Sequence, residues 1–272
     1  MLKNTRIEIP LKPRSARVVR IMDLSPTLRR VRLQGPELEG FGFHPLAPEA
    51  HVKLFFPPTP DDLRMPEVLE NGSADWQGAS EGRFSPFRDY TIRAFDEQQL
   101  TLDIDFVLHD EGVGGPWAKQ AKIGDILGIF GPRSVKLPPT NASNYVFFVD
   151  ETSLPAFARW LEILPNEARI DAWIEVASVD SEIPLSHGDN TNLNWLYRDS
   201  EDDQLYGALL YHALETLPIL SLGDATWLWA ATEAHVIAKM KRRLITLNSL
   251  ISPAHIDLVA YWKTASLGEQ KV

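Results

Sequence analysis

The chain of 272 residues contains no cysteine. This absence excludes disulfides, thiolate metal ligands, cysteine-bound iron–sulfur clusters and a cysteine nucleophile. The seven histidines never occur at His-x-x-x-His spacing, so the sequence predicts no catalytic metal bound by the protein. The Gly-x-Gly-x-x-Gly fingerprint of dinucleotide-binding folds is also missing.

An excess of positive charge is missing as well. Asp and Glu number 37 against 27 Lys and Arg, a formal net charge of -10, which argues against a nucleic-acid partner. No run of about 18 apolar residues occurs, so the sequence predicts no membrane insertion. Residues 1–20 are too polar for a signal peptide, and we expect a cytoplasmic protein.

The first half of the chain has the pattern of short strands. Apolar and polar residues alternate over 16–24 and 28–33, with a turn at 25–27, while 1–15 are expected to form a lead-in arm. Residues 57–87 are a long polar stretch of the kind that is functional or mobile. Further strands are predicted at 51–56, 88–95, 100–109 and 126–130, and a short helix at 117–121. Such a series fits an antiparallel barrel.

The pattern changes after Pro138–Asn141, which we interpret as a linker between domains 1–139 and 140–272. The apolar run 145–149 suits a parallel strand covered on both faces. Strands are also predicted at 170–177, 227–231 and 255–262, and helices at 154–164, 205–217 and 233–247. Alternation of strand and helix predicts a parallel α/β sheet.

The hexapeptide Arg88–Arg93 combines an arginine with an aromatic ring on one strand face. Residues two apart in a strand share a face, so Arg88 and Tyr90 are expected to point the same way, with Thr91 opposite. A guanidinium can bind phosphate in bidentate fashion and a phenol can stack on a ring, so the pair suits a flavin nucleotide. An ordinary solvated sheet face would show the same pattern.

This hexapeptide resembles the Arg-x-Tyr-Thr-x-Arg motif of the siderophore-interacting proteins, a branch of the ferredoxin-reductase superfamily. The order of later segments is similar to that family: 102–109, a glycine-rich turn at 112–115, Trp117-Ala118, Gly124-Asp125 and Gly131–Arg133. Backbone amides at the glycine-rich turn are expected to meet the pyrophosphate. The family usually has Gly-Pro-Ala-Ser-x-Trp-Ala there, so the loop is reshaped in this chain.

The second half resembles the family's nicotinamide-binding domain. Asp150–Ala156 is similar to Asp-Glu-Thr-Ala-x-Pro-Ala and follows the first parallel strand, where ligands of such sheets bind. Residues 229–234 resemble the family's strand-to-helix junction, with Thr232 in place of its glycine. Thr152 and Glu233 could equally have only a structural role at the start of a helix, Thr152 as a cap and Glu233 as a first-turn acid. Glu175, Asp180 and Glu182 favour NADH weakly, since an acid can bond a free ribose hydroxyl.

The resemblance implies a six-stranded FAD barrel followed by an α/β domain for NADH or NADPH. Near the end, Ala260–Lys263 resembles Gly-Tyr-Trp-Arg/Lys. Three cations, Lys53, Arg133 and Lys263, fall where the family has a basic patch for an anionic ferric siderophore. They would equally be unrelated surface cations. Cofactor contacts are expected from Arg88, Tyr90, Thr91, Arg93, Asp105, Phe106, Val107, His109, Gly114, Gly115, Trp117, Glu151, Thr152, Glu233, Tyr261 and Trp262.

The function expected from the resemblance is FAD-dependent reduction of ferric siderophores, with electrons from a nicotinamide or a ferredoxin and with no side chain acting as acid or base. Two alternatives stay open. One is another NAD(P)H-dependent flavin or ferredoxin reductase, and the other is a siderophore-binding module without turnover.

Overall fold

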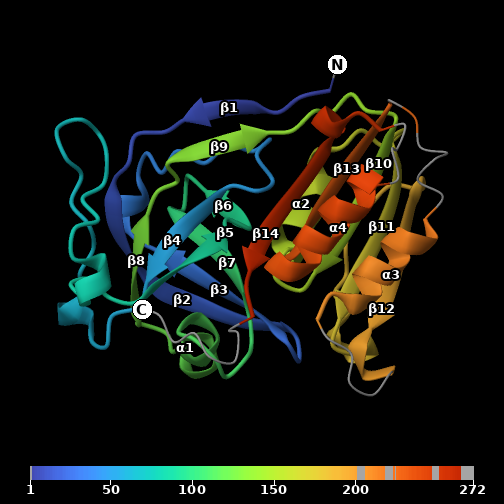
Figure 1. Ribbon diagram of the computed structural model, residues 1–272. Helices are drawn as coiled ribbons and strands as arrows, with labels where there is room; N and C mark the ends of the chain where they lie inside the picture. The colour runs from blue at the N-terminus through green and yellow to red at the C-terminus, as the bar shows by residue number, and fades with distance from the viewer. Residues whose placement is uncertain (1, 201–205, 218–222, 224, 247–250, 265–272) are drawn as a thin grey trace. The chain divides into compact units, whose positions relative to one another are not determined.

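The structure is a computed structural model that describes residues 2–200, 206–217, 223, 225–246 and 251–264 (Figure 1). The chain divides into two compact units. The N-terminal unit is Thr5–Leu137, and the C-terminal unit is the chain from Pro138 onward together with residues 2–4.

The N-terminal unit, which is described throughout, is built of antiparallel strands and one short α-helix. Its elements are β1 (Thr5–Glu8), β2 (Pro13–Ser25), β3 (Leu28–Gln34), β4 (His51–Phe55), β5 (Phe87–Thr91), β6 (Ala94–Asp96), β7 (Thr101–Val107), α1 (Gly114–Gln120), β8 (Ile126–Phe130) and β9 (Ser134–Leu137). The main sheet has the order β5-β4-β8-β2-β3-β7-β6, and β1 pairs with β9 in a separate ribbon. Alternate residues of these strands bury a core that includes Val31, Leu54 and Ile104.

The predicted single strand 88–95 is in fact two strands at the two ends of this order. Ile92 donates its N–H to the carbonyl of Ala50 at 2.8 Å, whereas the next residue, Arg93, donates to the carbonyl of Asp103 at 3.0 Å. The bend between β5 and β6 therefore carries the chain from the β4 edge to the β7 edge. Counted as one bent strand, β5 and β6 give the six strands that the sequence predicts around the sheet.

Other predictions for this unit need correction. The expected lead-in arm 1–15 contains β1 and the start of β2, because even a short polar strand such as β1 can pair with a partner like β9. Helix α1 begins at Gly114, three residues before the predicted start, since Pro116 has no N–H to satisfy and is tolerated in a first turn. Separately from these predictions, residues 78–82 have the Gly-x-Ser-x-Gly pattern of some serine hydrolases, but the serine lies in a 3-10 turn, Ala79–Glu81, and not between a strand and a helix.

The C-terminal unit is a parallel α/β sheet. Its described elements are β10 (Asn144–Asp150), α2 (Leu154–Ile163), β11 (Arg169–Val176), β12 (Thr191–Tyr197), α3 (Ala208–Thr216), β13 (Thr226–Glu233), α4 (Ala234–Thr246) and β14 (Ile256–Trp262). Within the described residues the strand order is β12-β11-β10-β13-β14, all parallel. Further 3-10 turns of the chain lie at Pro36–Leu38, Pro60–Asp62, Val179–Ser181, Arg198–Ser200 and Pro253–His255.

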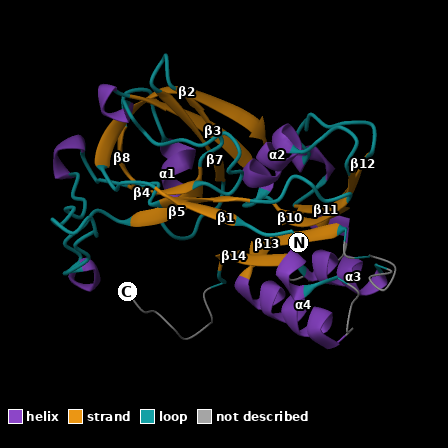
Figure 2. Ribbon diagram, turned by 90° about the horizontal axis from the view of Figure 1, so that it is seen from above, coloured by secondary structure: helices purple, strands orange, loops and turns teal. Residues whose placement is uncertain are grey.

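Helices cover both faces of this sheet (Figure 2). Phe147 packs against Phe157 and Trp160 of α2, whereas its neighbour Phe148 belongs to the cluster formed with α3 and α4. This confirms the prediction of a doubly covered strand at 145–149. Strand β12 had no prediction, although Leu193, Trp195 and Tyr197 alternate as an edge strand requires. The predicted helix ends Leu205 and Leu247 lie outside the described residues.

Candidate functional site

Strand β5 carries Arg88 and Tyr90 on its inner face. Arg88 lies opposite Leu54 and Tyr90 opposite Val52, and both of these β4 partners are core residues. Thr91 lies opposite His51 and points the other way, as the alternation predicts. Arg88 is exposed at the start of the strand, where its Nη1 donates to the carbonyl of Phe87 at 2.7 Å.

Tyr90 is part of an aromatic cluster. Its ring centroid lies 4.5 Å from that of Phe106, and Phe106 lies 5.3 Å from Trp117 of α1. Phe56 contacts all three of these rings. The cluster therefore joins β5, β7 and α1 through three of the residues that the sequence predicts to contact FAD. Phe106 is fully buried, whereas Tyr90 and Trp117 are partly exposed.

Burial raises the pKa of the Tyr90 phenol, and the nearby positive charge of Arg88 opposes this shift in part. The phenol is therefore neutral at physiological pH and keeps its proton to donate. A neutral ring beside an exposed guanidinium is what a ligand with a flat ring and a phosphate needs.

Helix α1 begins with two glycines that lie against the predicted site. A Cβ added to Gly114 would be 1.7 Å from the Tyr90 hydroxyl oxygen, and one added to Gly115 would be 2.7 Å from the His109 ring and its carbonyl. Side chains cannot be placed at such distances, so the backbone of the turn approaches Tyr90 and His109 as only glycine allows. The structure thus brings the glycine-rich turn to the aromatic cluster.

Other residues with a predicted cofactor role have partners of their own. Both carboxylate oxygens of Asp105 bind Arg30, at 2.6 and 2.8 Å, and the side chain is almost fully buried. Thr91 is buried on the opposite face from Tyr90, and Arg93 lies in the bend between β5 and β6. Val107 ends β7 and is partly buried.

The predicted substrate cations are distributed over both units. Lys53 lies in β4, where its ammonium binds Asp89 at 2.8 and 2.9 Å. Arg133 follows the end of β8 and is exposed. Lys263 directly follows β14 in the C-terminal unit and is also exposed.

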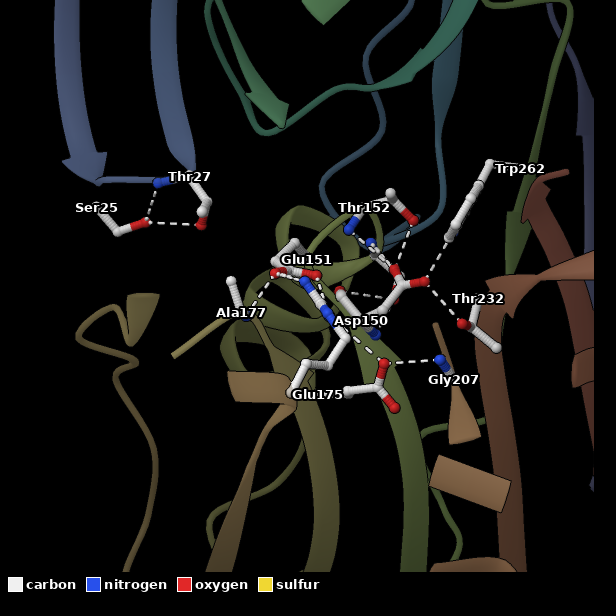
Figure 3. A network of polar contacts seen from close by, with 12 residues as sticks. Ser25, Thr27, Asp150, Glu151, Thr152, Glu175, Ala177, Gly207, Thr232 and Trp262 are labelled. Carbon is white, nitrogen blue, oxygen red and sulfur yellow. Dashed lines mark hydrogen bonds and ion pairs between the residues drawn. The ribbon is translucent and has the colours of Figure 1, made fainter. Parts of the chain in front are cut away.

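The carboxyl ends of the parallel strands hold a network of buried polar groups (Figure 3). Asp150, the last residue of β10, is its centre. Its Oδ1 accepts the hydroxyl of Thr152 at 2.6 Å and the N–H of Thr152 at 2.9 Å. Its Oδ2 accepts the hydroxyl of Thr232 at 2.7 Å and the indole N–H of Trp262 at 2.9 Å. One carboxylate therefore ties together the ends of β10, β13 and β14.

Glu151 and Glu175 flank this centre and share a guanidinium. Arg198, just after β12, binds Glu151 at 2.5 and 2.9 Å and reaches Glu175 at 3.4 Å. Glu151 also accepts the N–H of Ala177, and Glu175 accepts the N–H of Gly207 at 2.6 Å, just before α3. Burial raises the pKa of Glu175, opposed by the Gly207 N–H and by Arg198.

Glu233, the last residue of β13, is a further acid at the carboxyl ends of these strands and lies directly before α4. Its Oε2 accepts the N–H groups of His235 and Val236, and its Oε1 accepts the N–H of Thr264 at 3.2 Å. Tyr261 and Trp262 end β14, and the rings of Trp262 and Tyr206 are 5.2 Å apart. Glu151, Thr152 and Glu233 thus form hydrogen bonds to other groups of the C-terminal unit. Arg198, which had no predicted role, is central to this network.

The groups present fit a flavin nucleotide in the N-terminal unit. Glycines 114 and 115 leave the backbone at the start of α1 without side chains, and no side chain caps this helix start. Among the described residues, no group of three or more His, Cys, Asp or Glu is placed to hold a metal ion. In the same residues, no helix has the length and apolar character to span a bilayer.

An antiparallel N-terminal unit followed in the chain by a parallel α/β unit is typical of a ferredoxin-reductase-like fold. The ferredoxin-NADP+ reductase of Plasmodium falciparum, in a crystal structure of its H286L mutant, superposes with a TM-score of 0.63 at 14% identity, over 92% of this chain and 96% of that one. At this identity the likeness concerns the fold alone.

The chain belongs to the siderophore-interacting protein family. Residues 17–136 match the siderophore-interacting FAD-binding domain, and residues 142–265 match the siderophore-interacting protein model. The NADPH-dependent ferric-chelate reductase of Escherichia coli (strain K12) is 33% identical over 94% of this chain and 95% of its own length. The ferric vibriobactin reductase ViuB of Vibrio cholerae is 30% identical over 92% and 89%.

A solved structure agrees with this assignment. The crystal structure of a siderophore utilization protein from T. fusca has a TM-score of 0.84 and 34% identity, and the match covers 99% of this chain and 98% of that one. The predicted family and the predicted use of FAD are confirmed.

Proposed function

We propose that this protein is an FAD-dependent ferric-siderophore reductase that releases iron as Fe(II), with electrons from NADPH or NADH. The observation that carries the proposal is the meeting of Tyr90, Phe106, Trp117 and Gly114 in the unit that matches the FAD-binding model. When bound, FAD accepts a hydride and passes on single electrons. Fe(II) binds hard oxygen donors less tightly than Fe(III), so reduction frees the metal.

In the proposed function, the chain's own residues bind the cofactor and orient it. Arg88 would bind the pyrophosphate and the Tyr90 ring would stack on the isoalloxazine. Thr91, which is buried on the opposite face of β5, would reach the ring edge only where the flavin lies across the end of the strand. The Gly114–Gly115 backbone and His109 contact the nucleotide. Phe106 and Trp117 line the same side as Tyr90. Cofactor contacts from Arg93, Asp105, Val107, Tyr261 and Trp262 stay predictions from the sequence.

Lys53 and Arg133 of the N-terminal unit supply positive charge for the ferric siderophore, whose donor groups are commonly anionic, and a substrate contact from Lys263 stays a prediction from the sequence. Glu151, Thr152 and Glu233 act on the nicotinamide by shaping the carboxyl ends of the parallel strands. Glu175 no longer favours NADH, because its carboxylate is occupied by Arg198 and by the N–H groups at the start of α3. We propose the cytoplasm as the location of the protein and a ferredoxin as the alternative electron donor.

The test uses the purified full-length protein. We expect a flavin absorption spectrum, bleaching on anaerobic addition of NADPH or NADH, and Fe(II) formation from a ferric siderophore, measured with a chromogenic Fe(II) chelator. A folded protein that is colourless and cannot be reconstituted with FAD would refute the proposal. Bleaching without siderophore reduction would instead favour a flavin or ferredoxin reductase. A flavin that no nicotinamide or reduced ferredoxin bleaches would favour a binding module.

Two variants test the assigned roles. Tyr90→Ala is expected to lose flavin or to change its spectrum, and full retention of both would remove the stacking role. Lys53→Ala combined with Lys263→Ala is expected to raise the apparent KM for an anionic ferric siderophore. An unchanged KM would remove these two cations from the site.

A further inference from the structure

Lys53 is paired with an acid that the strand register places beside it. In the β4–β5 ladder Lys53 lies directly opposite Asp89, and the Lys53 ammonium binds both oxygens of that carboxylate, at 2.8 and 2.9 Å. Both side chains are on the outer face of the sheet, since their neighbours Leu54 and Tyr90 point to the core. The Asp89 side chain is 54% exposed and that of Lys53 is 32% exposed, so a ligand from solvent can reach the pair.

Aromatic rings hold the lysine from the other side. The Lys53 ammonium is 5.6 Å from the ring centroid of Phe87 and 5.9 Å from that of Trp76, distances typical of cation–π contacts. Phe87 and Trp76 are in turn 5.3 Å apart. The rings restrict the lysine stem, and Asp89 fixes its charged end.

Residues 57–86, which make up the long polar stretch 57–87 apart from the first residue of β5, supply one of these rings. Trp76 packs against Phe55, Phe84 and Phe130, so the stretch is anchored over the outer face of β4 and β8. Gly128 of β8 is covered by Leu63 and Met65 of the same stretch, which an added Cβ would meet at 2.7 and 2.6 Å. The environment of Lys53 is therefore built by a packed segment and not by a free loop.

We propose that Asp89 is a specificity-determining residue that offsets the charge of Lys53 and so favours ferric chelates of low net negative charge. This inference rests on the proposed function. A cation and an anion within 3 Å present a dipole to a distant ligand, so a highly anionic chelate gains less from Lys53 while Asp89 is in place than it would gain from an unpaired ammonium. An exposed ion pair contributes little to stability, and therefore Asp89 can be neutralised without harm to the fold.

The experiment compares two ferric chelates of different charge on the FAD-loaded protein. One is a hexadentate ferric tris(catecholate), which is trianionic, and the other is a ferric tris(hydroxamate), which is uncharged. Equilibrium binding to the oxidised protein is measured by quenching of tryptophan fluorescence, and steady-state reduction gives KM and kcat. The variants are Asp89→Asn, Lys53→Ala and the double variant, with Glu97→Gln as the matched control. Glu97 is exposed in the turn between β6 and β7 of the same unit, so its substitution changes net charge equally.

Asp89→Asn is expected to tighten binding of the trianionic chelate by about threefold to tenfold and to lower its KM. The reason is that the unpaired Lys53 ammonium attracts the trianion even across a screening salt solution. Binding of the uncharged chelate and kcat should stay within about twofold of wild type, as should every value for Glu97→Gln. In the Lys53→Ala background most of the gain from Asp89→Asn should vanish, since the effect depends on the freed ammonium.

Three results would overturn the inference: no tightening in Asp89→Asn, equal tightening in Glu97→Gln, or a gain that persists without Lys53. If wild type reduces both chelates and one of these results is found, the role of Asp89 fails while the proposed function stands. If wild type reduces neither chelate with any electron donor, the proposed function fails. The binding measurements on the single and double variants then still decide whether Asp89 offsets the charge of Lys53.

Discussion

The carboxylate of Asp150 and the indole of Trp262, 112 residues apart in the chain, are joined by a hydrogen bond of 2.9 Å. The same carboxylate oxygen accepts the hydroxyl of Thr232 at 2.7 Å. The carboxyl ends of β10 and β14, which are the first and last strands of the parallel sheet in chain order, are thereby fixed to each other and to β13. Lys263 follows Trp262 directly, so this bond also sets where that cation leaves the sheet.

Asp150→Ala should therefore destabilise the C-terminal unit. Removal of the buried carboxylate leaves the donors of Thr152, Thr232 and Trp262 without their acceptor, at a cost of about 2–4 kcal/mol in the free energy of unfolding. Asp180, which is exposed in a 3-10 turn, gives the control: Asp180→Ala should change this free energy by less than about 0.5 kcal/mol. Urea unfolding followed by circular dichroism measures both. Equal midpoints for the two variants would show that the network around Asp150 is not a stabilising one.

The fold class could be predicted because local patterns and tertiary packing agree. Phe147 and Phe148 point to opposite helical layers, and a continuous apolar run is the direct consequence. The bend at residues 92–93 could not be predicted, because the backbone partners of Ile92 and Arg93 are Ala50, just before β4, and Asp103 of β7, which are far apart in the sequence. A periodic pattern shows only that a segment is extended.

The meeting of several residues of the candidate site was predictable for a similar reason. Tyr90 and Trp117 have distinctive side chains in a familiar order, and the structure brings them together through Phe106. Arg198 lies in a polar region without a pattern of its own. Its role depends on Glu151 and Glu175, which reach it only when β10, β11 and β12 pair in parallel.

Glu175 should make the C-terminal unit less stable as the pH rises. Burial raises its pKa above the ordinary 4.5, so the folded chain binds this proton more tightly than the unfolded chain. Stability is therefore lost as the pH rises from that ordinary value through the raised folded pKa. Because glutamine cannot ionise, Glu175→Gln should gain stability relative to wild type over the same interval.

Urea unfolding from about pH 4.5 to about pH 8 tests this expectation, with the difference between variant and wild type as the measured quantity. Glu215→Gln is the control, since Glu215 is exposed on α3, and its difference should stay flat. A difference for Glu175→Gln that is flat or falls with pH would mean that Arg198 and the Gly207 N–H outweigh burial.

Two neighbouring arginines allow a matched test of buried and exposed ion pairs. Arg30 binds Asp105, whose side chain is 1% exposed, and Arg29 binds Asp23, whose side chain is 62% exposed. Asp105→Asn should cost about 2–4 kcal/mol because it leaves a half-buried guanidinium uncompensated. Asp23→Asn should cost about 0–1 kcal/mol.

Thermal and urea unfolding of the N-terminal unit measure this contrast, and FAD affinity adds a second readout. If Asp105→Asn is destabilised but binds FAD as wild type does, the carboxylate serves the scaffold through Arg30. A loss of FAD affinity beyond that of an equally destabilised variant would keep Asp105 among the cofactor contacts. Equal stability losses for Asp105→Asn and Asp23→Asn would contradict the role of burial.

Gly114→Ala should disrupt the meeting of α1 and β5. Alanine is the better helix former by about 0.5–1 kcal/mol, so propensity alone would predict a gain. The added Cβ would, however, be 1.7 Å from the Tyr90 hydroxyl oxygen, and the resulting shift should cost about 1–3 kcal/mol and weaken FAD binding. Tyr90→Phe removes that oxygen, and the nearest ring carbon is then 2.8 Å away. The double variant should therefore recover part of the loss, which thermal unfolding and FAD titration would measure.

Gly188→Ala, whose Cβ would meet its nearest atom at 3.4 Å, should have little effect. If Tyr90→Phe brings no recovery, the clash does not involve the phenol, and Tyr90 does not lie against the glycine turn as described.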